Sequence, residues 1–343
     1  MPAPPTQSVF APRAEVCTAL NVDSQTFAQA HARFPVLWPQ AYLDAALGSS
    51  AIAAMGKPDM RETLVNPADL ADPVSDLALR PVPFLVRKHI DRVILLTTKS
   101  CHFYCRFCFR RAESHRQAGN PSRSDWALIF DYLRANPEIR EAILSGGDPL
   151  TLSNQNLAWI LEQLDQIPSI QKVRIHSRAP VHFPQRVDAE LVSVCAQGKP
   201  LRLVCHFNHL DECQNENLRV IQMFQTAGIS VGNQAVLLAG VNDSPADQVA
   251  LWSRLWDWQI WPHYLHHPDR APGNAHFRVS IQKGLDIYGQ MQKSAQVPLP
   301  SYVLDLPDGS GKIPVAEMDQ LSNCAYQYRH PDGRISTYQD GGV

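Results

Sequence analysis

The sequence predicts an α/β fold, a partial TIM-like (β/α)6 barrel with a helical N-terminal extension and a short C-terminal extension. From Arg92 onward, short β-rich runs alternate with amphipathic segments of helix length, which is the pattern of repeated βα units and a parallel sheet. Polar residues follow several of these runs, where the active residues of such barrels lie. A chain of 343 residues is long enough to form one large domain of this kind.

We expect three segments along the chain. Residues 1–80 form the helical extension, with helical patterns at Ser24–Arg33 and Pro39–Ala46 and a polar linker at Asn66–Pro73. Residues 81–295 form the barrel, and residues 296–343 form a C-terminal segment that carries Lys312. The predicted strands are Val93–Thr97, Ala142–Ser145, Val173–His176, Leu201–His206, Val231–Leu237 and His263–His266.

Helices are expected between these strands. Ser124 is the predicted N-cap of a helix that reaches Asn136, because it precedes the apolar positions Trp126, Ile129, Phe130 and Leu133. Asn154–Ile167 and Asn215–Ala227 repeat this amphipathic pattern.

Three cysteines follow the first strand at the spacing C-x3-C-x2-C, namely Cys101, Cys105 and Cys108. Three thiolates on one short loop can hold three irons of a 4Fe-4S cluster and leave the fourth iron open to a bound molecule. A zinc knuckle or three unrelated buried thiols are the alternatives. Zinc is disfavoured because the next cysteines, Cys195 and Cys205, lie far downstream and form no second pair. The spacing is similar to that of radical S-adenosylmethionine enzymes, whose open iron takes the amino and carboxylate groups of that cofactor.

Polar residues at the other strand ends are candidates for the same cofactor site. Ser145-Gly146-Gly147-Asp148 follows the second strand, and its glycines allow close approach of the backbone to a ligand. His206 ends the fourth strand and is expected to line the site, although a lone histidine is more often a rim residue. Gln234 follows Asn233 within an apolar run, so both amides require partners in the protein or in a ligand.

Lys312 follows a Gly-Ser-Gly loop near the C-terminus. The loop is no phosphate-binding P-loop, because Ile313 and Leu306 occupy the positions of the required hydroxyl and first glycine. A loop that presents one lysine also suits a Schiff base with pyridoxal phosphate. Taken alone, a solvated surface lysine is the simpler interpretation.

Taken together, these motifs resemble the lysine 2,3-aminomutases among the radical S-adenosylmethionine enzymes. The likeness runs from about Pro81 to Val315. It includes Asp91-Arg92-Val93, the three cysteines with Arg110-Arg111, Ser145–Asp148, His206–His209, Asn233-Gln234, Gly240–Asp243 and Asp305–Val315.

The resemblance implies a role for each matching residue. The three cysteines would bind the cluster, Lys312 would hold pyridoxal phosphate, and Arg110 would pair with the substrate carboxylate. Asp269 and Asp305 would receive the distal ammonium of the substrate. Lys88 and Arg92 would meet the cofactor phosphate, although Lys88 replaces an arginine of well-known members. Ser145, Gly146, Gly147, Asp148, His206 and Gln234 would contact the cofactors.

Two carboxylates near a site are costly unless they meet a cation, so lysine or a related diamino acid is the expected substrate and glutamate is disfavoured. The family moves the α-amino nitrogen of lysine to the β-carbon by way of a deoxyadenosyl radical. We therefore expect an isomerase that interconverts L-lysine and β-lysine and uses a 4Fe-4S cluster, S-adenosylmethionine and pyridoxal phosphate.

Several alternatives stay open. The chain has the length and the Cys108-Phe-Arg-Arg sequence of the short branch that supplies β-lysine for modification of elongation factor P. An aminomutase for another amino acid, a radical enzyme without pyridoxal phosphate and an electron-transfer iron-sulfur protein are further possibilities. Ser244 replaces a cysteine of zinc-containing relatives, so we expect no structural zinc.

Composition limits the partners. The formal net charge of −2 indicates no attraction to nucleic acid or to an anionic membrane, and no apolar run approaches the roughly 20 residues of a membrane-spanning helix. Eight cysteines, three of them needed as thiolates, fit a reducing compartment, so we expect a cytoplasmic protein. An amino acid, a reductant protein such as flavodoxin or ferredoxin, and further copies of the chain in a homo-oligomer are the expected partners.

Overall fold

The computed structural model describes residues 9–112 and 119–340 of the chain. Its main feature is a nine-stranded sheet in which the strands are neighbours in chain order. Strands β2 to β8 are parallel, and β1 and β9 pair antiparallel at the two edges. The strands are β1 (Leu85–Val86), β2 (Arg92–Thr98), β3 (Glu141–Gly146), β4 (Lys172–His176), β5 (Leu201–Cys205), β6 (Ser230–Val236), β7 (Trp261–His266), β8 (Ser301–Leu306) and β9 (Gly311–Pro314).

The partial barrel is confirmed, and all six predicted strands are present as β2 to β7. The parallel sheet also contains β8, which the sequence pattern did not separate from the loop that carries Lys312. The side chains of β8 alternate between the two faces of the sheet. Tyr302 and Leu304 pack in the hydrophobic core, while Asp305 lies on the opposite face, toward the inside of the barrel. Asp305 therefore lies near the C-terminal end of a parallel strand, as barrel active-site residues do.

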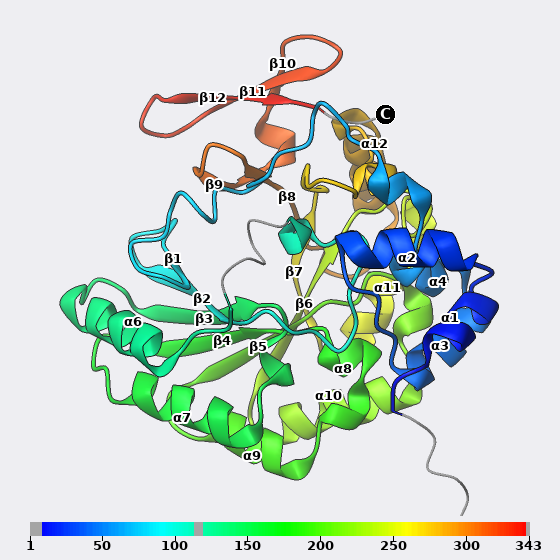
Figure 1. Cartoon of the computed structure of the whole chain (residues 1–343). Helices are drawn as coiled ribbons and strands as arrows, with labels where there is room; N and C mark the ends of the chain where they lie inside the picture. Colours follow the sequence, from blue (N-terminus) through cyan, green and yellow to red (C-terminus); the bar gives the residue numbers. More distant parts are fainter. Residues whose placement is uncertain (1–8, 113–118, 341–343) are drawn as a thin grey trace, which may run out of the picture.

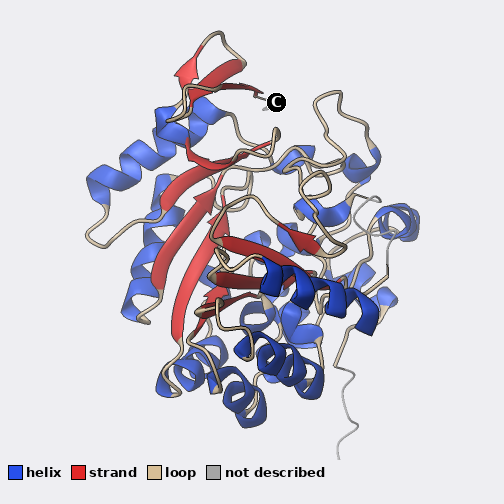
Figure 2. Cartoon of the chain, turned by 90° about the vertical axis from the view of Figure 1, so that its left-hand side faces the viewer, coloured by secondary structure: helices blue, strands red, loops and turns tan. Residues whose placement is uncertain are grey.

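Amphipathic helices cover the outer face of the curved sheet (Figures 1 and 2). They are α6 (Arg123–Ala135), α7 (Asn154–Asp165), α9 (Ala189–Ala196), α10 (Asn215–Thr226), α11 (Pro245–Asp257) and α12 (Ile281–Ser294). The four-residue α8 (Ala179–His182) is fully buried and follows the end of β4. Single 3-10 turns lie at Met60–Thr63, Phe109–Arg111, Pro149–Thr151, Pro184–Arg186, Leu210–Glu212, Ala275–Phe277 and Val315–Glu317.

The predicted N-cap of α6 was wrong by two residues. Ser122 is the N-cap, because its hydroxyl accepts the backbone N–H of Asp125 at 3.2 Å while the Asp125 carboxylate accepts the backbone N–H of Ser122 at 2.8 Å. This reciprocal capping box satisfies two donors at once, whereas Ser124 lies inside the first turn. The predicted apolar face is buried against the sheet.

The helical N-terminal region has a core of its own. It contains α1 (Arg13–Ala19), α2 (Ser24–Arg33), α3 (Gln40–Leu47) and α4 (Ser50–Gly56). Trp38, Leu43 and Met55 are fully buried there, and Phe103 and Phe107 from the cysteine loop belong to the same cluster. The N-terminal region therefore packs directly on the loop that carries the three cysteines.

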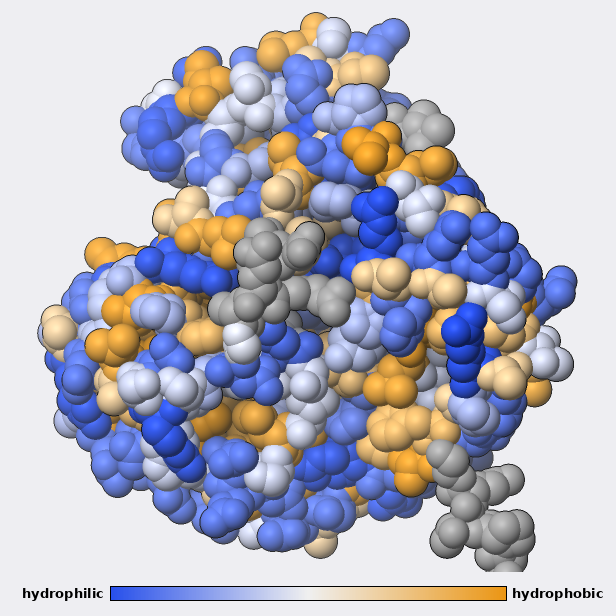
Figure 3. Space-filling model, viewed as in Figure 1, coloured by the Kyte–Doolittle hydropathy of each residue, from blue (hydrophilic) through white to orange (hydrophobic). Residues whose placement is uncertain are grey.

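A small antiparallel sheet forms the C-terminal end of the described chain. Its strands are β10 (Asp319–Gln320), β11 (Ala325–Arg329) and β12 (Ile335–Gln339), and it lies beyond β8 and β9 at the top of Figure 1. Figure 3 shows hydrophilic and hydrophobic residues interspersed over this face of the molecule, with a notch below the small sheet. Within the described ranges, no helix has both the length and the apolar character needed to cross a bilayer.

Candidate active site

The three cysteines of the C-x3-C-x2-C loop lie together directly after β2. None of them is in a disulfide bond, and the backbone N–H of Cys108 donates to the carbonyl of Cys105 at 3.0 Å. Burial raises the pKa of all three thiols. Repulsion between neighbouring thiolates adds to this effect at Cys101 and Cys108, and the pKa of Cys108 reaches about 11. The loop thus holds protonated thiols that would lose their protons on binding a metal.

Residues between the cysteines attach this loop to the N-terminal region. The ring of Phe103 makes edge contacts with Trp38 and Tyr42, at centroid distances of 4.7 and 4.9 Å. Arg106 is fully buried and pairs with the buried carboxylate of Glu62. Because a buried charge requires its partner, this pair fixes the cysteine loop on the N-terminal helices.

The three thiols form one donor set. They lie close enough for their charges to interact. A 4Fe-4S cluster binds each thiolate at a different iron, so three neighbouring thiols on one loop fit the predicted cluster.

Arg178 is a residue of this site that the sequence analysis did not select. Its Nη1 donates to the Sγ of Cys105 at 2.8 Å, and its Nε donates to the carbonyl of His206 at 2.9 Å. Burial alone would lower the pKa of Arg178, but Cys105 and the buried Glu212 raise it, so the guanidinium stays charged. The sequence signal was its position after β4, the same rule that selected the other strand ends.

The glycine loop after β3 packs on the backbone of the cysteine loop. Gly147 donates its N–H to the carbonyl of Thr98 at 2.6 Å, and a Cβ at Gly147 would lie 2.4 Å from the carbonyl oxygen of Ser100. Gly146 has φ of +115°, which side chains rarely tolerate. The two glycines are therefore needed for this close approach whether or not they also contact a ligand.

The carboxylate of Asp148 holds neighbouring strand ends together. It accepts the hydroxyl of Ser177 at 2.7 Å and the backbone N–H groups of Arg178 at 2.9 Å and Ala179 at 3.0 Å. This carboxylate positions Arg178, and its predicted contact with a cofactor stays a prediction.

His206 presents an unsatisfied nitrogen. Its Nε2 is buried and has no hydrogen-bond partner among the described residues, and burial lowers the imidazole pKa well below its usual value. A neutral buried imidazole with a free nitrogen can meet a polar ligand group. Of the neighbouring amides, Asn233 is used by the fold, because it exchanges two hydrogen bonds with the backbone of Phe207. Gln234 is on the adjacent position of β6.

A chain of alternating charges leads to Lys312. Asp305 and Lys312 lie opposite each other on β8 and β9, and the Nζ of Lys312 is 2.6 Å from the Oδ2 of Asp305. The Nζ of Lys88 is 3.5 Å from the Oδ1 of Asp305 and 3.2 Å from the Oδ1 of Asp76. Asp76 in turn pairs with Arg110, whose Nη2 is 2.8 Å from Oδ2. The five residues form one charge network. Lys88, Arg110 and Lys312 are its cations, and Asp305 and the unpredicted Asp76 are its carboxylates.

The charge state of this network is set by pairing. Burial alone would lower the pKa of Lys312, but Asp305 raises it, so the resting amine is protonated. Asp269 differs, because no side chain in the described part of the chain pairs with it. Burial, with repulsion from Asp305, raises its pKa to about 7. A carboxylate without a bound cation therefore lies within the electrostatic reach of the network near neutral pH.

The two basic residues expected at the cofactor phosphate occupy different places. Lys88 lies between Asp76 and Asp305, whereas the Nε of Arg92 is 2.9 Å from Asp91 at the start of β2. Asp76 was not predicted from the sequence because its partners are remote in sequence.

Ser244 caps α11, with its hydroxyl accepting the backbone N–H of Asp247 at 3.1 Å.

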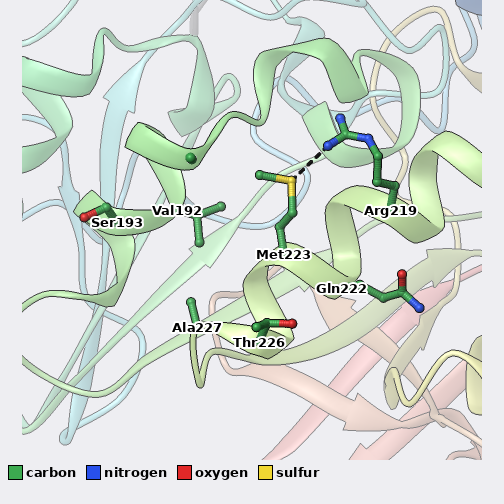
Figure 4. A pocket seen from close by; sticks show the side chains of 8 residues that line it. Val192, Ser193, Arg219, Gln222, Met223, Thr226 and Ala227 are labelled. Carbon is green, nitrogen blue, oxygen red and sulfur yellow. Dashed lines mark hydrogen bonds between the residues drawn. The ribbon is translucent and has the colours of Figure 1, made fainter.

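An open groove on the surface lies away from these residues. It has a volume of about 570 Å³ and lies between the outer sides of α9 and α10 (Figure 4). Val192, Met223 and Arg219 line it, and Arg219 donates to the sulfur of Met223 at 3.0 Å. It contains none of the predicted site residues.

Comparison with known proteins identifies similar sequences and folds. The Radical SAM superfamily matches residues 95–252, which include the cysteine loop and the strands up to β6. An L-lysine 2,3-aminomutase of Methanococcus maripaludis is 36% identical over 78% of this chain and 62% of its own length. One of Acetoanaerobium sticklandii is 37% identical over 80% of this chain and 67% of its own length. A glutamate 2,3-aminomutase of Clostridioides difficile is 31% identical over 74% of this chain and 65% of its own length. The solved structure of Streptococcus suis SuiB has a TM-score of 0.48 and 16% identity over 63% of this chain and 49% of its own.

The fold and the cysteine loop define a radical S-adenosylmethionine protein. Within that class, the chain belongs to the lysine 2,3-aminomutase family. The aligned region spans 62% of the Methanococcus relative and 66% of a Clostridium subterminale relative, so this chain matches only part of those longer proteins.

Proposed function

We propose that this chain is a lysine 2,3-aminomutase that interconverts L-lysine and β-lysine. The observation that carries the proposal is the placement of a three-thiol loop and an ion-paired lysine at the edge of one sheet where its parallel strands end. Family membership supports the same reaction. When bound, the cluster with S-adenosylmethionine supplies a radical that removes hydrogen, and pyridoxal phosphate supplies a carbonyl that takes up the migrating nitrogen.

The cysteines and their neighbours would serve the radical cofactors. Cys101, Cys105 and Cys108 would hold three irons, and Arg178 would keep its hydrogen bond to the Cys105 sulfur. The free Nε2 of His206 would meet S-adenosylmethionine. Ser145 to Asp148 and Gln234 would line the same cofactor space.

Lys312 would hold pyridoxal phosphate. Its amine must first lose the proton that Asp305 now stabilises. Loss of that charge, together with a turn of Lys88 toward the cofactor phosphate, would leave the carboxylates of Asp305 and Asp269 without the cations that lie beside them in this structure. The distal ammonium of lysine would restore the balance, because two carboxylates near a site are costly without a cation.

This charge pattern favours lysine over glutamate. A glutamate side chain would add a third carboxylate beside Asp269 and Asp305, although a relative named glutamate 2,3-aminomutase shows that the family includes such an enzyme. Arg110 would bind the carboxylate common to both amino acids, which gives no discrimination. Selectivity therefore rests on the two aspartates.

The remaining roles are further parts of the proposal. We propose that Lys88 and Arg92 turn toward the cofactor phosphate when it is present. The protein would work in a reducing compartment, the cytoplasm, where a reductant protein supplies the electron and where the cluster thiolates persist. The three segments 1–80, 81–295 and 296–343 and a homo-oligomeric state are proposed with it.

The test is an anaerobic assay of cluster-reconstituted protein with pyridoxal phosphate, S-adenosylmethionine, dithionite and one amino acid at a time. Chromatography should detect β-lysine from L-lysine and no β-amino acid from glutamate, arginine or ornithine. Cys105→Ala protein, loaded with pyridoxal phosphate in the same way, is the control and should give no product. Formation of β-glutamate would show that glutamate is a substrate and would contradict the proposed preference for lysine. Release of deoxyadenosine without any β-amino acid would refute the aminomutase activity.

A further inference from the structure

One carboxylate of the network has no place in the reaction as described so far. Asp76 is 1% exposed and comes from the segment before the barrel, yet it touches both Arg110 and Lys88. We propose that Asp76 is a positioning residue that presents the guanidinium of Arg110 to the substrate carboxylate. This inference rests on the proposed function and adds a residue that selects for amino acids with a free carboxylate.

The contacts of Arg110 leave one side of its guanidinium for a ligand. Asp76 Oδ2 accepts hydrogen bonds from Nε at 3.0 Å and from Nη2 at 2.8 Å, so it occupies the edge of the guanidinium that these two nitrogens form. The ring of Phe109 lies 4.5 Å from the guanidinium carbon. Among the residues that the structure describes, Nη1 makes only the longer contacts to Ser145 Oγ at 3.2 Å and to the Gly146 carbonyl at 3.5 Å. The Nη1–Nη2 fork is therefore the edge that can take a carboxylate with two parallel hydrogen bonds.

Asp76 can orient Arg110 because its own backbone is fixed. The carboxylate of Asp72 accepts the backbone N–H groups of Asp76 at 2.9 Å and Leu77 at 2.8 Å. Ser75 has φ of 56°, and its hydroxyl donates to the carbonyl of Pro307 at 2.6 Å. The segment is thus attached to the turn between β8 and β9, the hairpin that carries Lys312.

The charge of Asp76 also compensates for the burial of Arg110. Arg110 and Lys88 together keep the carboxylate ionised, so the guanidinium has a permanent counter-ion behind it. A guanidinium oriented in advance loses less freedom when it binds a carboxylate. Without the carboxylate, Arg110 would be free to turn its fork toward Ser145 and Gly146.

Two ligands that differ only in the carboxylate isolate this effect. L-Lysine and cadaverine share the amine and the distal ammonium, so the ratio of their dissociation constants reports the contribution of the Arg110 fork. Protein loaded with cluster and pyridoxal phosphate, without S-adenosylmethionine or dithionite, is titrated with each ligand through the change in Schiff-base absorbance. Any effect of Lys88 on the distal ammonium changes both constants and cancels in the ratio.

The expected results follow from the geometry. Wild-type protein should prefer L-lysine, and Asp76→Asn should lower the preference about tenfold, the value of one charge-assisted interaction. Arg110→Lys should lower the preference for L-lysine by a similar factor. The double variant Asp76→Asn/Arg110→Lys should lower this preference no further than Arg110→Lys alone. Asp76→Glu keeps the charge but lengthens the side chain, and should lie between wild type and Asp76→Asn. Asp131→Asn makes the same chemical change at a side chain on α6 that is 74% exposed, and should leave the ratio unchanged.

Three outcomes would overturn the inference. In the first, neither dissociation constant changes in either Asp76 variant. In the second, the affinities for L-lysine and cadaverine fall by the same factor, which leaves the ratio unchanged and would indicate a merely structural role. The third is exchange with neither ligand by wild-type protein, which would refute the proposed function itself and is recognised without any variant.

Discussion

Asp269, whose carboxylate pairs with no described side chain, leads to a prediction that can be tested without enzyme turnover. Burial and repulsion from Asp305 raise its pKa from 3.8 to about 7. Between these two pH values the folded protein keeps a proton that the unfolded chain has lost. The stability of the fold should therefore fall as pH rises through this interval and level off above it. Asp269→Asn cannot ionise and should remove this dependence.

The size of the effect follows from the pKa difference. A shift of about three units corresponds to about 4 kcal/mol when fully developed, and about 2.5 kcal/mol of it should develop between pH 5 and pH 8. These values are upper limits, because the side chain is only partly buried and water screens its charge. Asp269→Asn should thus gain stability over wild type with rising pH, by at most about 5 °C in Tm at roughly 2 °C per kcal/mol.

The assay is thermal unfolding of both proteins without pyridoxal phosphate or substrate at pH 5 and pH 8. Asp131→Asn is the matched control, because that side chain is 74% exposed and should show no pH-dependent difference. A Tm difference between Asp269→Asn and wild type that is constant with pH, or that favours wild type at pH 8, would refute the assignment of Asp269 as an uncompensated carboxylate. The same outcome would remove the electrostatic reason for a cationic substrate.

Three further substitutions separate the parts of the site. Lys312→Ala should abolish the Schiff-base absorbance with pyridoxal phosphate while the iron-sulfur absorbance is retained; a borohydride-reducible adduct in this variant would contradict the role of Lys312. Arg178→Gln should make the reduction potential of the cluster more negative, because it removes a positive charge and an N–H···S bond at Cys105, and a redox titration followed by electron paramagnetic resonance would measure it. Gly147→Ala should cost about 1 to 3 kcal/mol in unfolding free energy, since its Cβ would meet the Ser100 carbonyl at 2.4 Å. Gly289→Ala on α12 meets no atom within 4 Å and should instead be neutral or stabilising in the same thermal scan.

Local patterns predicted those parts of the molecule that depend on neighbours in sequence. The polar residues at the strand ends and the amphipathic face of α6 were predicted in this way, and the cysteine loop was recognised from its spacing. The N-cap of α6 was placed two residues late, because Ser122 and Ser124 both precede the apolar run and only the partner Asp125 distinguishes them. Strand β8 was missed because its polar Asp305 and the following glycines dominated the interpretation of that stretch.

Other features depend on contacts that no local pattern contains. Asp76 is 34 residues from Arg110 in sequence, and nothing in the stretch Asp72–Arg80 distinguishes its carboxylate from those of the surrounding linker. Similarly, Glu62 and Arg106 become a buried pair only because the N-terminal helices pack on the cysteine loop. Such pairs are set by tertiary packing, and their energies depend on burial that the sequence alone does not reveal.

The most direct test of the central claim follows the migrating nitrogen itself. L-Lysine labelled with ¹⁵N at the α-nitrogen and ¹³C at carbon 3 is incubated anaerobically with the fully reconstituted protein and observed by ¹³C NMR. The account predicts that carbon 3 acquires a one-bond coupling to ¹⁵N as β-lysine forms. Carbon 3 that stays uncoupled while deoxyadenosine accumulates would show that the radical is formed but that this chain does not move the nitrogen of lysine.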